Sequence, residues 1–201
     1  MSEFERWEAR FSATEYIFGT APNAFLAAQK PLLPPVGRAL AVADGEGRNG
    51  VWLAEQGLEV LSLDFSPTAQ AKARALAQAR NVALTTELAD ATTWRWPEAA
   101  FDVIVVIFTQ FANPTERSQM FAGIRKALRP RGLLLMQGYT PRQLQYGTGG
   151  PKQIENLYTR DLLEREFASL SELQIEERDC DMREGSAHAG MSAVIELVGR
   201  K

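Results

Sequence analysis

The chain has 201 residues, of which 45% are hydrophobic and 23% are charged. These proportions are typical of a globular protein, and the length favours one domain with a single core. The net charge of −3, with acidic and basic residues scattered along the chain, argues against a surface that grips nucleic acid phosphates.

The first part of the chain is predicted to alternate strands with helices. Arg38–Asp44 is a short apolar run that stops at a glycine, which indicates a buried strand ending in a tight turn. Arg48–Gln56 has the partly apolar face of a helix, and Glu59–Asp64 is a second strand. Ser66 is a typical N-cap residue, so it predicts a helix over Pro67–Arg80 that begins with a proline at its first position.

The middle of the chain continues this alternation. Val82–Glu87 is predicted as the third strand and Phe101–Phe108 as the fourth. Phe101–Phe108 is apolar almost throughout, as expected when both faces of a parallel sheet are covered, so it should be central. Asn113 and the proline after it repeat the cap signal before a helix that ends at Leu128. Leu133–Gln137 is the fifth strand.

The end of the chain breaks the pattern. A helix near Thr159–Phe167 precedes strands near Leu173–Arg178 and Ser192–Val198. The connection near Met182–Gly190 is too short for a crossover helix, so the final strand should run antiparallel to its predecessor. We therefore predict a doubly wound α/β fold of Rossmann-like type, with a mostly parallel seven-stranded sheet and an antiparallel last strand.

A glycine-rich turn follows the first predicted strand. Gly45, Gly47 and Gly50 satisfy G-x-G-x-x-G directly between a strand and a helix. Such glycines let the backbone approach a ligand closely, at the sheet edge where doubly wound folds bind ligands. Asp64 lies 17 residues after Gly47, where a carboxylate can accept hydrogen bonds from both hydroxyls of a ribose. The alternative is that the glycines only form a turn and that Asp64 is solvated.

An acidic residue also follows the third predicted strand. The Asp90 carboxylate can accept a hydrogen bond from an adenine amino group, and the backbone N–H of Ala91 can donate to a ring nitrogen. Alone, Asp90 is better interpreted as a loop or cap aspartate. Together with Asp64, it predicts an adenosine lying across the strand ends.

These segments resemble the class I S-adenosylmethionine-dependent methyltransferases, and within them the tellurite-resistance-type branch. The resemblance covers most of the chain and is carried by ALAVADGEGRNGVWLAEQG, LSLDFSP, the Asp90-Ala91 pair, FDVIVVIF and ALRPRGLLLMQGY. It implies S-adenosyl-L-methionine as the cofactor. The residues that it implies for cofactor binding are Tyr16, Ala43, Asp44, Gly45, Gly47, Arg48, Asp64, Phe65, Ser66, Asp90, Ala91 and Phe108.

The resemblance also assigns roles. Asp64 would hold the ribose, and Phe108 would lie beneath the methionine end of the cofactor. Residues 1–35, which include Tyr16, would form an N-terminal cover over a core of residues 36–201 within a single domain. The family usually has an acidic residue in the first strand and a glycine two positions later, where this chain has Ala41 and Ala43. We expect the Asp44 carboxylate, or nearby carbonyls, to replace that acid near the methionine ammonium.

The expected activity is in-line transfer of a methyl group to a small-molecule acceptor. A poor nucleophile would need a general base, whereas a soft anion would not. The candidates are His188, the chain's one histidine, between the last two strands, and Tyr146, in a loop after the fifth strand. For His188 the favoured interpretation is a surface loop residue. The loop of Tyr146 is interpreted equally well as a flexible insertion.

Two other functions remain open from sequence. The first is a non-catalytic protein that binds S-adenosylmethionine or S-adenosylhomocysteine, an alternative that Ala41 and Ala43 keep open. The second is a nicotinamide-dependent oxidoreductase, because that class of enzyme shares the G-x-G-x-x-G fingerprint. The absence of a Tyr-x-x-x-Lys pair and the antiparallel last strand argue against the oxidoreductase.

The remaining expectations concern partners and location. Cys180 is the single cysteine, so an intrachain disulfide and a thiolate zinc cluster are excluded. The longest strongly apolar run, Val103–Phe108, is too short to span a membrane. We therefore expect a cytoplasmic protein, monomeric or homodimeric, with no metal and with no nucleic acid or membrane partner.

Overall fold

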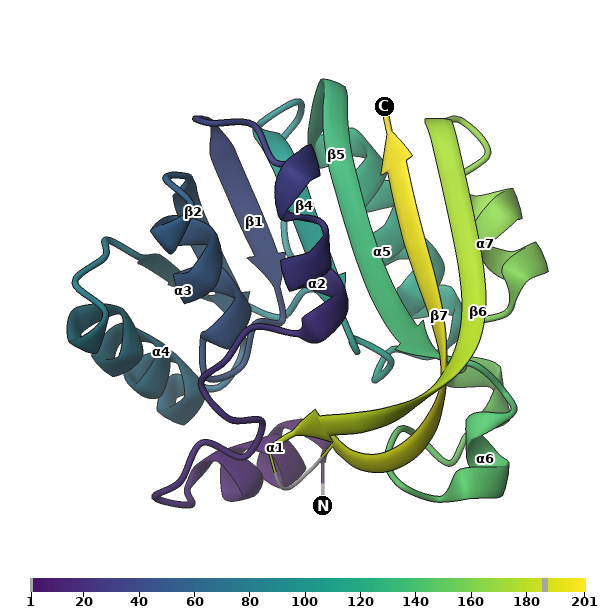
Figure 1. The fold of residues 1–201 in the computed structure, drawn as a ribbon, viewed down its shortest axis with the longest axis horizontal. Coiled ribbons are helices and arrows are strands. Elements are labelled where there is room, and N and C mark those ends of the chain that lie inside the picture. The colour runs from purple at the N-terminus through teal and green to yellow at the C-terminus, as the bar shows by residue number, and fades with distance from the viewer. Residues whose placement is uncertain (1, 186–187) are drawn as a thin grey trace.

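The computed structural model describes residues 2–185 and 188–201. Its sheet has seven strands in the order β3-β2-β1-β4-β5-β7-β6 (Figure 1). The first five strands pair in parallel, and β7 pairs antiparallel with both β5 and β6. The predicted fold class is therefore confirmed. The strands are β1 (Arg38–Val42), β2 (Glu59–Asp64), β3 (Thr85–Leu88), β4 (Phe101–Ile107), β5 (Leu128–Tyr139), β6 (Ser171–Glu184) and β7 (His188–Arg200).

Helices cover both faces of the sheet. One face carries α2 (Ala24–Ala28), α3 (Arg48–Glu55) and α4 (Pro67–Ala79), and the other carries α5 (Pro114–Ala127) and α7 (Arg160–Glu166) (Figure 1). Beyond the carboxyl ends of the parallel strands lie α1 (Glu3–Phe11) and α6 (Gln143–Tyr146). Two short 3-10 turns complete the elements, at Lys30–Leu32 and Ile154–Asn156.

The central position of β4 follows from its apolar sequence. Val103 and Val105 pack into the core under α2 and α3, and Ile104 and Val106 pack into the core under α5 and α7. Each of these side chains is almost fully buried. Burial of one such side chain stabilises the fold by about 1.5–3 kcal/mol, so an apolar strand with alternating sides gains most between two helical layers.

The predicted last two strands are too short. β6 begins at Ser171 and continues to Glu184, and β7 begins at His188, so most of the predicted connection Met182–Gly190 is paired strand. Beyond Arg178 the strand β6 is mainly polar and exposed, so no apolar run in the sequence predicts a strand there. Backbone pairing with β7 keeps this part of β6 extended. This hairpin curves away from the sheet and passes beneath the carboxyl ends of the parallel strands toward α1 (Figure 1).

Smaller differences have local causes. The third strand begins at Thr85 and not at Val82, because the Val82 N–H donates to the Ala77 carbonyl at 3.1 Å and completes the end of α4. The fifth strand is longer at both ends than Leu133–Gln137. The other predicted elements before the final hairpin agree within two residues at each end. Across the described residues, every helix is too short or too polar to cross a membrane.

Candidate active site

A cavity lies at the carboxyl ends of the central parallel strands. Its walls come from the turn after β1, the end of β2, the end of β4, the helix α1 and the first residue of β7. Two further cavities share wall residues with it. We call the three the central, base-side and acceptor-side cavities.

The glycine-rich turn forms one wall of the central cavity. Gly47 caps the start of α3 with φ of +87°, and a Cβ there would lie 2.5 Å from the Ala73 Cβ of α4. Only glycine fits this position, because the backbone is left-handed and α4 packs against it. Ala43 also adopts positive φ, 48°, and its side chain faces both the central and the base-side cavities.

Asp44 braces this turn from within. Its carboxylate accepts hydrogen bonds from the Gly50 N–H at 3.2 Å and from the Ser62 hydroxyl at 2.8 Å. Burial raises the pKa of Asp44 to about 7, against the effect of these two donors. Asp44 lines the central cavity, so its expected place near a ligand ammonium stays a prediction beside this bracing role.

Asp64 occupies the end of β2, where the central and base-side cavities meet. It is 3% exposed, and its two carboxylate oxygens accept hydrogen bonds from the N–H groups of Gly45 at 2.8 Å and Ser66 at 2.9 Å. Burial raises the pKa of Asp64 to about 6, although these backbone donors act in the other direction. Each oxygen retains acceptor capacity for a further donor.

The base-side cavity is flat-walled and lies past β3. It is lined by Asp90 and Ala91 together with the rings of Phe65 and Phe111, whose centroids are 6.5 Å apart at 21° from parallel. One Asp90 oxygen accepts hydrogen bonds from the backbone N–H and hydroxyl of Thr92, each at 2.8 Å. This geometry fixes the loop and presents a carboxylate and a buried alanine to the cavity.

His188 lies where the central and acceptor-side cavities meet. It is 8% exposed, and its ring lies 4.5 Å from the rings of Phe18 and Phe108. Its Nδ1 is buried without a hydrogen-bond partner among the described residues. Burial, followed by the charges of Arg48 and Arg10, lowers the pKa of His188 to about 3, so the ring is neutral. The expectation of a surface loop histidine is wrong, because the long hairpin carries His188 under the sheet.

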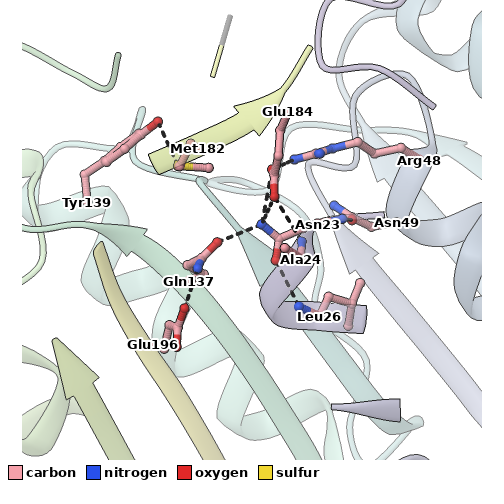
Figure 2. A network of polar contacts seen from close by, with 10 residues as sticks. All are labelled: Asn23, Ala24, Leu26, Arg48, Asn49, Gln137, Tyr139, Met182, Glu184 and Glu196. Atoms are coloured by element: carbon pink, nitrogen blue, oxygen red, sulfur yellow. Dashed lines mark hydrogen bonds and ion pairs between the residues drawn. The ribbon is translucent and has the colours of Figure 1, made fainter. Parts of the chain in front are cut away.

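A buried polar network ties the hairpin to the N-terminal segment and the sheet (Figure 2). The Asn23 side-chain amide donates to Gln137 at 2.7 Å and to Glu184 at 3.0 Å. Arg48 pairs with the other Glu184 oxygen at 2.6 Å, and both side chains are at most 10% exposed. Gln137 in turn donates to Glu196 at 2.7 Å. Sequence analysis did not identify Asn23, Gln137 or Glu184, because their pairing depends on where the hairpin returns.

The helix α1 is held over the site by its own contacts. Glu8 accepts hydrogen bonds from the hydroxyls of Ser66 and Thr68 at the start of α4. Trp7 and Phe11 stack at 5.4 Å between centroids, and both line the central cavity. Sequence analysis missed these two aromatic residues. Their spacing on an amphipathic helix was the available signal, but it did not reveal the docking surface.

The structure therefore brings together most of the predicted residues, but not all of them. Tyr16 donates its hydroxyl to the Lys72 carbonyl on α4 at 3.1 Å, and Tyr146 donates to Asp179 at 2.9 Å. Neither residue lines any of the three cavities as described. Gly47 and Ser66 do not line the cavities; they form the starts of α3 and α4 next to the site. The predicted residues that line the cavities are Ala43, Asp44, Gly45, Arg48, Asp64, Phe65, Asp90, Ala91, Phe108 and His188.

The acceptor-side cavity was not predicted from sequence. Trp7, Phe18, Phe108 and Phe111 line it as well as the central cavity. Basic side chains from α1 and from the loop after α6 line it alone: Arg6, Arg10 and Lys152. It is therefore aromatic where it meets the central cavity and positively charged elsewhere.

Comparison with known proteins gives consistent results. Residues 39–132 match the family model described as a methyltransferase domain. A demethylmenaquinone methyltransferase from Thermus thermophilus is 32% identical over 106 residues, which are 52% of this chain and 48% of that protein. The matched part thus spans about half the length of that relative.

Solved structures with low identity share the fold. TehB from Haemophilus influenzae superposes with a TM-score of 0.71 at 14% identity, over 98% of this chain and 66% of that one. The N-methyltransferase NodS from Bradyrhizobium japonicum, solved with S-adenosyl-L-homocysteine, has a TM-score of 0.71 at 15% identity, over 98% of this chain and 97% of that one.

Proposed function

We propose that this chain is a class I methyltransferase, which transfers a methyl group from S-adenosylmethionine to a small-molecule acceptor. The match of residues 39–132 to a methyltransferase-domain model and the fold of the chain support the proposal. One observation carries the proposal. A continuous set of cavities at the carboxyl ends of the strands joins the glycine-rich turn to Asp64 and then to Asp90 and Ala91.

The residues present fit this cofactor. Asp64 has acceptor capacity for the two ribose hydroxyls, and the base-side cavity offers the Asp90 carboxylate and the near-parallel rings of Phe65 and Phe111 to a purine. A side chain at Gly45 would point toward the Phe11 ring, 3.3 Å away, so glycine leaves this wall of the central cavity open. The methionine end would then lie near Phe108 and Asp44.

The chain's contribution to the chemistry is alignment and exclusion of water. When bound, the cofactor would supply a methyl carbon that is already activated by its positively charged sulfur. Trp7, Phe11 and Phe108 surround the central cavity with rings, which exclude water and attract positive charge. The neutral His188 ring lines the boundary between the central and acceptor-side cavities.

A second candidate is a protein that binds the cofactor without turnover. Ala43 favours this candidate, because it lines two cavities with a left-handed backbone at a position where the family usually has glycine. This candidate predicts tight binding and no product with any acceptor.

The expectations on setting stay part of the proposal. They are a small-molecule acceptor, a monomer or homodimer, a cytoplasmic location, and no nucleic acid or membrane partner. The net charge of −3, with acidic and basic residues interspersed, supports the expectation of no nucleic acid partner.

Calorimetry with S-adenosylhomocysteine and with NADH tests the proposal. We expect S-adenosylhomocysteine to bind the unmodified chain, and Asp64→Asn to weaken binding about 10- to 100-fold by losing charge-assisted hydrogen bonds. The matched control is Asp161→Asn, which changes an exposed aspartate of α7 and should bind as the parent does. Binding of NADH alone would contradict the proposal. Tight cofactor binding with no S-adenosylhomocysteine released across thiol, phenol and oxyanion acceptors would favour the second candidate.

A further inference from the structure

We propose that the acceptor-side cavity selects a flat, negatively charged acceptor, of the class of aromatic acids that carry a hydroxyl or thiol nucleophile. This inference rests on the proposed function, because it assigns the acceptor to a cavity beside the proposed cofactor site. It names the substrate class that the proposed function leaves open.

The charge of the cavity is the first support. Its wall includes Arg6, Arg10 and Lys152, and no Asp or Glu is among the described residues that line it. Arg6 pairs with Glu3 on the exposed side of α1. Neither Arg10 nor Lys152 forms an ion pair within the described ranges 2–185 and 188–201. Arg10 and Lys152 are therefore two cations without a paired acid on one wall, an arrangement suited to an anionic ligand.

Arg10 is also held in place without an acid. Its guanidinium carbon lies 4.6 Å from the centre of the Trp7 ring and 5.8 Å from that of Phe18. Burial and the neighbouring Arg6 charge lower the pKa of Arg10, which is what an unneutralised cation in a crowded basic site experiences. Stacking orients the guanidinium but uses none of its N–H donors, so these remain for a carboxylate.

The aromatic walls define the shape of the ligand. Trp7, Phe18, Phe108, Phe111 and Tyr139 all line the acceptor-side cavity. Phe108 lies 4.5 Å from Tyr139 between ring centroids, and it adopts positive φ, 54°, which turns the chain at the end of β4. Rings on several sides favour a planar apolar body over a tetrahedral inorganic ion.

The position of the charges sets the orientation of the ligand. Arg6, Arg10 and Lys152 line only the acceptor-side cavity, whereas His188 lines this cavity and the central one. An acid group on the basic wall would leave the other part of the ring near His188 and the central cavity. The nucleophile of the acceptor would then lie beside the His188 ring, where the two cavities meet. When such a nucleophile takes the methyl group, its proton leaves to water.

Calorimetry on the chain preloaded with S-adenosylhomocysteine tests the inference. The probes are para-hydroxybenzoate, its methyl ester, which removes only the charge, and selenite, which keeps charge without a ring. We expect para-hydroxybenzoate to bind at least about tenfold tighter than the ester and than selenite. In the double variant Arg10→Met, Lys152→Met the preference for the acid over the ester should fall below about threefold.

Two controls separate this inference from the proposed function. Affinity for S-adenosylhomocysteine should be unchanged in the double variant, because Arg10 and Lys152 do not line the central cavity. Arg165→Met, at an exposed arginine of α7, should retain the full preference for the acid. Equal binding of acid and ester, tighter binding of selenite, no binding of the acid, or a preference that survives in the double variant would each overturn the inference. Failure to bind S-adenosylhomocysteine at all would overturn the proposed function first.

Discussion

Ala43 combines an unfavourable backbone conformation with a place on the cavity wall. Its φ is 48°, where a non-glycine residue costs about 1–2 kcal/mol, and its Cβ faces two cavities. Ala43→Gly removes both the strain and the methyl group, but it increases the freedom of the unfolded chain. We expect the free energy of unfolding to change by less than about 1 kcal/mol, while S-adenosylhomocysteine binds more tightly in calorimetry.

The matched control is Ala41→Gly, two residues earlier in β1. Ala41 is buried in an extended strand, so its replacement should lower the free energy of unfolding by roughly 1 kcal/mol without any gain in affinity. An unchanged affinity in Ala43→Gly would show that the alanine methyl group does not restrict the cofactor site.

Asp44 makes stability depend on pH. Its folded pKa of about 7 lies above the ordinary 3.8, so the folded state binds the extra proton. The stabilisation by this proton is complete below pH 3.8 and is lost as the pH rises through 7. Asp44→Asn is neutral at every pH. Its free energy of unfolding relative to the parent should therefore increase between pH 5 and pH 8, by on the order of 1–3 kcal/mol, in urea titrations.

The comparison for this prediction is Asp161→Asn, at an exposed aspartate, whose stability difference from the parent should stay constant over the same range. A difference for Asp44→Asn that shrinks as the pH rises would contradict the raised pKa.

Individual site residues were predictable where a residue of a suitable type directly follows a predicted strand. Gly45, Asp64 and Asp90 follow buried strands directly, so their location at one sheet edge follows from topology. Trp7 and Arg10 belong to helix α1, which packs over the site from a distant part of the sequence. No local sequence pattern predicts where on the fold this helix packs. Tyr16 carried the expected residue type but packs against α4.

The β6–β7 hairpin depends on one buried ion pair. Glu184 pairs with Arg48 and accepts a hydrogen bond from Asn23, so Glu184→Gln leaves the Arg48 charge buried without compensation. Removing one member of a buried pair typically costs about 3–5 kcal/mol. We expect the free energy of unfolding to fall by about 3 kcal/mol, and amide exchange in the hairpin to accelerate.

An exposed pair on the same hairpin gives the control. Arg183 is 85% exposed and pairs with Asp181, so Arg183→Gln should change the free energy of unfolding by less than about 1 kcal/mol. If Glu184→Gln is equally mild, the buried pair does not hold the hairpin against the N-terminal segment.

Helices and strands that bury many apolar side chains were predicted more accurately than exposed ones. The central strands and the helices that cover them carry apolar residues at the period of their structure, so β4 and α5 were placed within two residues. The outer half of β6 is polar on exposed faces, and its strand character comes from pairing with β7. Periodicity cannot reveal a strand that buries little.

The topology of the whole molecule followed from the order of its elements. Most of the strands are separated by helices, which favours parallel pairing with crossovers, although no helix lies between β3 and β4 in the described residues. The lack of a helix between β6 and β7 favours their antiparallel pairing, as the sheet shows. The cover over the sheet edge was predicted only as an N-terminal segment. Its second part, the curved hairpin bearing His188, arises from long-range contacts with Asn23 and Arg48.

Cofactor binding should stabilise the entire chain. A ligand that binds only the folded state, present at 100 times its dissociation constant, adds about 2.7 kcal/mol. For a chain of this size, that corresponds to a rise in Tm of roughly 5–10 °C. Scanning calorimetry with S-adenosylhomocysteine should show this rise, and adenosine alone should give a smaller one. A Tm that does not respond would mean that the folded chain has no such site.

The crystal structure of the complex with S-adenosylhomocysteine tests the central claim most directly. We predict that both ribose hydroxyls donate to the Asp64 carboxylate, with the adenine beside Asp90 and Ala91 and the sulfur facing Phe108 and His188. A nucleoside bound away from the ends of β2 and β3, or side chains filling these cavities in the crystal, would contradict the account.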